Sequence, residues 1–116
     1  MELPPDTIRE EPGTPEVEAA TRRLAALAHP VRLRILRQLA VRDACCVKDL
    51  VPRIGLAQST VSQHIKVLVS AGLVSYRPNR QTSCYSLDRA ALTALVGEIG
   101  DLLRTCCDQN FCSKNE

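Results

Sequence analysis

The sequence predicts a mostly helical domain that carries a short two-stranded β-hairpin. Of its 116 residues 45% are hydrophobic but only 3% are aromatic, so its core must be aliphatic, which suits helices. Apolar residues recur at helical spacing in successive segments between residues 14 and 107. Two β-type runs, residues 73–78 and 81–87, flank Asn79-Arg80 and predict the hairpin.

The first two helices are recognised by their starts and by their apolar stripes. Thr14-Pro15-Glu16 is a helix start, because a hydroxyl can cap the helix, proline suits its first turn and an acid favours its positive end. The first helix then carries one apolar face, made of Val17, Thr21, Leu24 and Leu27 or Ala28. Pro30 begins a second helix, whose buried residues are expected to be Val31, Ile35, Leu36 and Leu39.

Two further helices lie close together before the hairpin. The third is expected to end at Gly55, and its apolar stripe is Val47, Leu50, Val51 and Ile54. The fourth begins at Gln58 or Ser59 and stops at Gly72. Such a pair is a helix-turn-helix, and the hairpin after it makes the fold winged. In such folds the second helix enters the major groove of DNA and the wing can reach the neighbouring backbone.

The fourth helix has two distinct faces. Val61, Ile65 and Leu68 fall on one side of it, and a polar face holds Ser59, Ser62, Gln63, Lys66 and Ser70. A solvated surface helix would normally mix both signs of charge. Here no acid occurs between Asp49 and Asp88. We therefore predict that the polar face contacts base edges and phosphates, with Lys66 and the wing residues Arg77 and Arg80 on phosphates.

The last helix predicts a second subunit. Asp88 is expected to cap it, and its apolar stripe is Leu92, Val96, Ile99, Leu103 and Cys106. This helix is too apolar to lie free in water, so we expect it to pack against the first helix and a partner, making a homodimer through the first and last helices. A symmetric dimer would place two recognition helices about 34–36 Å apart.

Composition divides the chain and excludes some functions. Residues 1–13 are expected to be a disordered tail, residues 14–107 the folded domain and residues 108–116 a cysteine-bearing tail. Neither a membrane span nor a secretory signal is apparent, which predicts a cytoplasmic protein with no membrane partner. Its six cysteines then indicate metal binding or redox sensing rather than disulfides. No glycine-rich phosphate loop or activated cysteine is evident, so we do not expect an enzyme.

Three segments resemble the ArsR/SmtB family of metal- and metalloid-responsive repressors. They are Ala-His-Pro-Val-Arg-Leu-Arg-Ile-Leu (28–36), Ser-Thr-Val-Ser-Gln-His-Ile-Lys-Val-Leu (59–68) and Ala-Gly-Leu-Val (71–74). The resemblance implies a dimeric repressor that leaves operator DNA when a ligand binds. It also places on the recognition helix Ser59, Thr60, Ser62, Gln63, His64 and Lys66. His64 falls nearer the apolar side, so a partly buried histidine bonded to a neighbouring element is at least as good an interpretation as a base contact.

The resemblance also suggests the inducer. Arsenic sensors of this family often carry Cys-Val-Cys-Asp-Leu-Cys where this chain has Cys46-Val47-Lys48-Asp49-Leu50-Val51, and the last helix here holds no histidine for zinc or nickel. Cys106, Cys107 and Cys112 are similar to a trio that holds arsenite or antimonite in some members. Trivalent arsenic and antimony prefer three thiolates. These ions are therefore the predicted inducers, and no organic cofactor is expected.

Several alternatives for the cysteines stay open. Three sulfurs cannot converge on an intact helix, so either the chain turns near Asn110 or one ligand comes from the partner subunit. Cys45 and Cys46 are secondary metal candidates, and Cys84 is expected to be inert. The alternative function is a thiol redox or persulfide sensor of the same fold, with a disulfide from Cys107 to Cys112 or between subunits.

Overall fold

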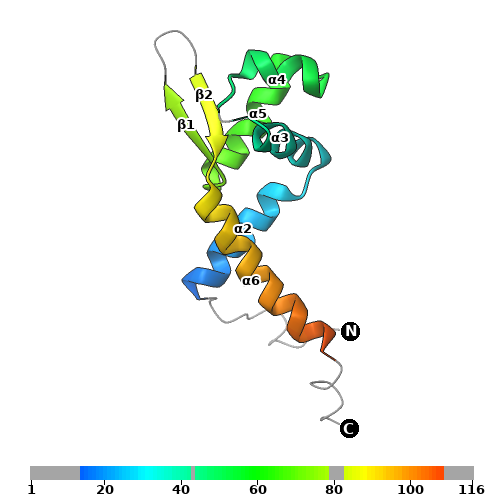
Figure 1. Cartoon of the computed structure of the whole chain (residues 1–116), viewed down its shortest axis with the longest axis vertical. Helices are drawn as coiled ribbons and strands as arrows, with labels where there is room; N and C mark the ends of the chain where they lie inside the picture. The colour runs from blue at the N-terminus through cyan, green and yellow to red at the C-terminus, as the bar shows by residue number, and fades with distance from the viewer. Residues whose placement is uncertain (1–13, 43, 79–82, 109–116) are drawn as a thin grey trace, which may run out of the picture.

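The computed structural model describes residues 14–42, 44–78 and 83–108, and it confirms a mostly helical domain with one antiparallel hairpin (Figure 1). The helices and strands follow in the order α2 Pro15–Leu27, α3 Pro30–Ala40, α4 Val47–Ile54, α5 Gln58–Ser70, β1 Val74–Pro78, β2 Ser83–Leu87 and α6 Arg89–Cys107. The predicted tail at 1–13, the Asn79-Arg80 turn and all of the second tail except Asp108 lie outside the described residues.

Local signals set where the helices begin and end. The side chains of Thr14, His29 and Asp88 each accept a backbone hydrogen bond in the first turn of the helix that follows. Gly55 and Gly72 both have a φ of 82°, a left-handed conformation that glycine adopts at no steric cost, and they follow α4 and α5. The predicted boundaries of the helix-turn-helix are therefore confirmed.

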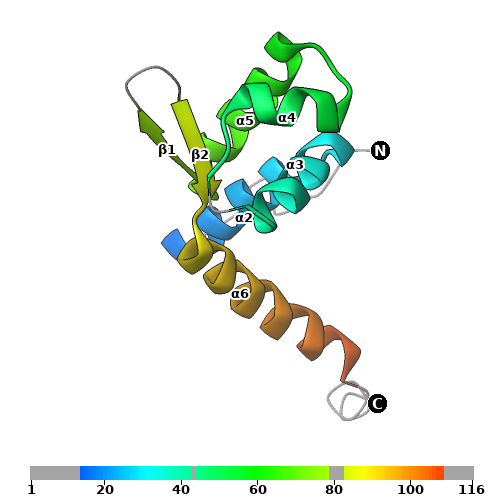
Figure 2. The same ribbon diagram turned by 45° about the horizontal axis from the view of Figure 1, so that its top comes forward.

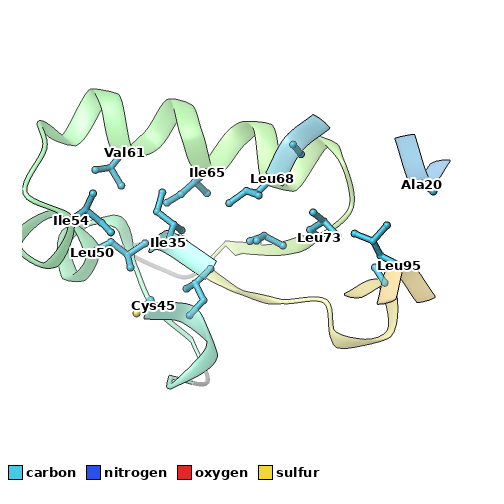
Figure 3. Packing of buried hydrophobic residues seen from close by; sticks show 14 residues of the cluster. Ala20, Ile35, Cys45, Leu50, Ile54, Val61, Ile65, Leu68, Leu73 and Leu95 are labelled. Carbon is cyan, nitrogen blue, oxygen red and sulfur yellow. The ribbon is translucent and has the colours of Figure 1, made fainter. Parts of the chain in front are cut away.

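The core lies where α3, α4 and α5 meet the hairpin. In Figure 3 the apolar face of α5 points toward side chains of α3 and α4. The fully buried large side chains are Ile35, Leu39, Leu50, Ile65, Leu68, Leu73, Val61 and Cys45. Because α5 buries one whole face here, its opposite polar face is held outward.

The wing is attached to the domain on one side. β1 and β2 pair from Val74 opposite Leu87 to Pro78 opposite Ser83. Cys45, just before α4, makes an isolated bridge to β2: its N–H donates to the Tyr85 carbonyl at 3.0 Å, and the Tyr85 N–H donates back at 2.8 Å. The hairpin is thus bonded both to itself and to the start of the helix-turn-helix.

The apolar faces predicted for the first and last helices are left largely exposed in the single chain, as expected of faces that pack on a second subunit. Val17 is 56% exposed, Val96 is 72% exposed and Leu103 is 55% exposed. α6 packs on the domain through the buried Ala91 and Leu95 and the partly buried Leu92 and Ile99, and its C-terminal end then extends away from the domain (Figures 1 and 2). In the described part of the chain no helix combines the length and apolar character that a membrane crossing needs.

Candidate nucleic-acid interface

The outward face of α5 presents the residues that the sequence assigned to DNA. Ser59, Gln63 and Lys66 are exposed, whereas Thr60 and Ser62 are half-buried. No side chain caps the start of this helix at Ala57. The backbone N–H groups of its first turn can therefore donate hydrogen bonds to other acceptors, such as phosphate oxygens. The face is polar and acid-free, as expected from the sequence.

A hollow of about 300 Å³ lies beside this face, between the start of α4, α5 and β2. Lys48 and Gln58 line it together with Ser62. Sequence reasoning did not assign a role to Lys48 or Gln58. Gln58 precedes Ser62 by one helical turn, a spacing that could have revealed it. Nothing in the sequence placed Lys48 there, because its position depends on how α4 packs against α5.

The wing also carries a cation. Arg77 is exposed on β1, whereas Arg80 lies outside the described residues. Cross-strand contacts hold the hairpin: the rings of Tyr76 and Tyr85 lie 5.4 Å apart, and the Tyr76 hydroxyl lies 3.1 Å from Ser83 Oγ. Burial, and secondarily the neighbouring Tyr76, raise the pKa of Tyr85 above 10.0. Arg77 therefore lies on a strand that cross-strand side-chain contacts hold in place.

His64 is directed toward α3. Arg32 Nε donates to His64 Nδ1 at 3.2 Å, and the His64 ring lies 4.4 Å from that of His29 at a tilt of 48°. Burial first, and then the neighbouring His29 and Arg32, lower the pKa of His64 below 6.5. This geometry favours the partly buried interpretation of His64 over a base contact.

Stability should depend on the protonation of His64. Between the lowered pKa and 6.5 the unfolded chain binds more protons at this site than the folded chain, so stability is lost as pH falls through that window. We expect the free energy of unfolding to fall there by up to about 1.4 kcal/mol per pH unit from this residue. Urea unfolding of wild type and His64→Gln across pH 6.5 measures the difference between the two slopes. If the free energy of unfolding depends on pH equally in wild type and His64→Gln, protonation of His64 does not affect stability.

Two arginines of α3 have structural partners. Arg32 Nη1 donates to the Ala26 carbonyl at 3.1 Å, which gives a hydrogen-bond partner to a carbonyl in the last turn of α2. Arg34 Nη2 donates to the Ile54 carbonyl at 2.9 Å, at the end of α4. These two cations therefore stabilise helix ends.

The predicted metal ligands are brought together only in part. Cys106 and Cys107 are free, exposed and adjacent at the end of α6, and Cys112 lies outside the described residues. Within the ranges 14–42, 44–78 and 83–108 no three His, Cys, Asp or Glu side chains gather as a metal site would require. The exposed pair offers soft sulfur donors without imidazole, a donor set that suits a trivalent metalloid once a third thiol joins.

The other cysteines differ in their environments. Cys45 is buried, and that burial raises its thiol pKa above 9.0, against a smaller opposing effect of Arg42. Cys46 is half-buried at the start of α4, and its Sγ donates to Asp49 Oδ2 at 3.3 Å. Cys84 is half-buried on β2. A protonated buried thiol is a poor metal ligand, so Cys45 is the weaker of the two secondary candidates.

Known proteins resemble this chain in sequence. The family model described as "Bacterial regulatory protein, arsR family" matches residues 29–76. Nodulation protein NolR of Rhizobium meliloti is 38% identical over 87 residues, which are 75% of this chain and 70% of that protein. The arsenical resistance operon repressor of Bacillus subtilis (strain 168) is 33% identical over 82 residues, or 71% and 73% of the two chains.

A solved structure is similar over most of its length. The homodimeric winged helix-turn-helix DNA-binding domain of a possible ArsR-family transcriptional regulator from Mycobacterium bovis is 30% identical, with a TM-score of 0.60, and the match covers 77% of this chain and 84% of that one. The family description names regulatory proteins rather than enzymes, in agreement with the sequence prediction.

Proposed function

Because this chain belongs to the ArsR family of bacterial regulatory proteins, we propose that it represses transcription by binding operator DNA as a homodimer. We further propose that trivalent arsenic or antimony releases it by binding cysteine thiolates. The observation that carries the first proposal is the acid-free, outward polar face of α5 beside the wing.

The proposed DNA contacts follow from the exposure of each side chain. The first turns of α5, with Ser59, Thr60, Ser62 and Gln63, would enter the major groove, where amide and hydroxyl groups read base edges. Lys66 and Arg77 would neutralise phosphates, as would Arg80 in the wing. His64 would support α5 from behind through its contact with Arg32.

Lys66→Ala and Gln63→Ala should have different effects. Loss of Lys66 should weaken binding to all sequences and reduce the salt slope by roughly 1, because one phosphate contact is lost. Loss of Gln63 should change sequence preference, at a cost of about 1–3 kcal/mol if it reads a base. Fluorescence anisotropy on operator and random duplexes at several salt concentrations measures both effects.

A matched control is Arg89→Ala, which removes an exposed cation at the start of α6 away from the polar face. It should leave both affinity and salt slope close to the wild-type values. An equal loss on operator and random DNA for Gln63→Ala would contradict the base-reading role. A salt slope unchanged by Lys66→Ala would contradict its phosphate contact.

The exposed apolar residues of α2 and α6 support the homodimer. Val17 and Leu24 of α2, with Ile99 and Leu102 of α6, line a groove of about 250 Å³. An exposed apolar surface on two crossing helices is typical of a subunit interface. The homodimeric domain from Mycobacterium bovis has the same fold. A two-fold axis here would present two copies of α5 to the DNA.

The cysteine pair at the end of α6 supports the proposed inducer. Cys106 and Cys107 would hold the ion together with Cys112, from the same or the partner subunit, and the ion would supply bonds to three thiolates. The similarity to an arsenical resistance operon repressor favours this inducer over the redox alternative. Cys46, half-buried, remains the stronger secondary candidate.

A further inference from the structure

A second groove, of about 510 Å³, lies on the side of α5 that faces α2 and α3. Ala25 of α2 and Val67 and Ala71 at the end of α5 give it an apolar floor. Its volume falls in the range of small-molecule sites, about 300–1,000 Å³. Neither the proposed DNA contacts of α5 nor the proposed metalloid site at the end of α6 requires such a groove.

Three cations surround this floor. Arg22 comes from α2, Arg32 from α3 and Lys66 from α5, and none of the described residues that line the groove is acidic. The guanidinium of Arg32 already bonds the end of α2 and His64, so its charge is fixed in place. Arg22 and Lys66 are exposed at the rim. A fixed positive field over an apolar floor selects for negative charge joined to an apolar body.

We propose that this groove binds a small organic anion, one that joins an acidic head to a short aliphatic or aromatic body. The head would lie among Arg22, Arg32 and Lys66, where charge-assisted hydrogen bonds are available. The body would cover Val67 and Ala71 and remove their apolar surface from water. An inorganic anion would leave this floor uncovered.

Binding in this groove would also weaken operator binding. Lys66 belongs both to the groove and to the proposed phosphate contacts, so an anion beside it competes with the DNA backbone. This consequence rests on the proposed operator binding, whereas the site itself does not. Such an anion would be a second inducer, independent of the cysteines.

The probe for the site is hexanoate, titrated into the full chain without DNA and followed by amide NMR shifts. We expect saturable shifts centred on Ala25, Val67 and Ala71. Hexanamide, which has the body without the charge, and acetate, which has the charge without the body, should each bind at least about tenfold more weakly. Arg22→Gln should weaken hexanoate binding by a similar factor, and the adjacent Arg23→Gln, which does not line the groove, should not.

Each outcome decides one part of the proposal. Absent, unsaturable or dispersed shifts, or shifts centred on the α2–α6 groove, would overturn the site. Equal binding of hexanamide would overturn the role of the cations. With operator DNA, hexanoate should lower the affinity of wild type, and Arg22→Gln should need about tenfold more hexanoate for the same effect. Unchanged operator affinity, despite saturated shifts in the free protein, would overturn the inducing effect and leave the site standing.

Discussion

Serine at Cys106, Cys107 or Cys112 should abolish the release of operator DNA by arsenite or antimonite and leave operator binding itself intact. Full switching from mostly bound to mostly free DNA needs on the order of 5 kcal/mol of coupling between inducer and DNA. Three metal–thiolate bonds can supply that, whereas two bonds in a site that prefers three cannot hold the same arrangement. Because Cys106 and Cys107 are exposed, replacing either sulfur by oxygen should not disturb the core.

The measurement is anisotropy of labelled operator DNA, with reduced protein and increasing arsenite or antimonite. Cys84→Ser is the matched control, since it removes a thiol of the wing strand and should leave release close to wild type. Cys45→Ser and Cys46→Ser should also leave release largely working. If Cys46→Ser abolishes release while Cys112→Ser retains it, the sensing site lies at the start of α4 and our assignment is wrong.

Val96→Glu should break the homodimer and with it most of the affinity for a two-fold operator. Val96 is 72% exposed in the single chain, so a carboxylate there does not disturb the folding of the subunit. In the proposed interface the same charge would be buried without a partner, at a cost of several kcal/mol. Analytical ultracentrifugation should show monomer at micromolar concentration, and circular dichroism should show unchanged helix content.

The chain offers a closely matched control for this change. Val41 is 76% exposed at the C-cap of α3 and belongs to neither α2 nor α6, so Val41→Glu introduces the same group into an equally exposed site. It should remain dimeric and bind operator normally. A Val96→Glu variant that stays dimeric with full operator affinity would remove α6 from the interface.

The sequence predicted the helix-turn-helix well because its signals are local. Apolar spacing and left-handed glycines set α4 and α5, and Asp88 set the start of α6. For α2 and α6 the sequence predicted the apolar faces but could not apportion them between the chain and its partner. Periodicity shows that Val96 belongs to an apolar face, but it does not show whether that face packs within the chain or on a second one.

The site was predictable only where exposure follows helical phase. The phase of α5 placed Ser59 and Gln63 outward correctly. It also indicated a partly buried His64 bonded to a neighbouring element, but it could not name the partners His29 and Arg32, because the Arg32 bond joins residues 32 positions apart. Lys48 was missed for the same reason, since its place beside Ser62 depends on tertiary packing.

The bridge between Cys45 and Tyr85 has a mechanical consequence. It bonds the hairpin to the extended residues that lead into α4, and α4 packs on α5. The recognition helix α5, α4 and the wing are therefore each held by contacts with the next. Contacts of this kind resist bending at any single joint. Each DNA-binding unit would then move as a rigid body. Ligand binding at the C-terminal end of α6 would change how the two subunits are oriented relative to each other, while the internal structure of each unit would stay nearly the same.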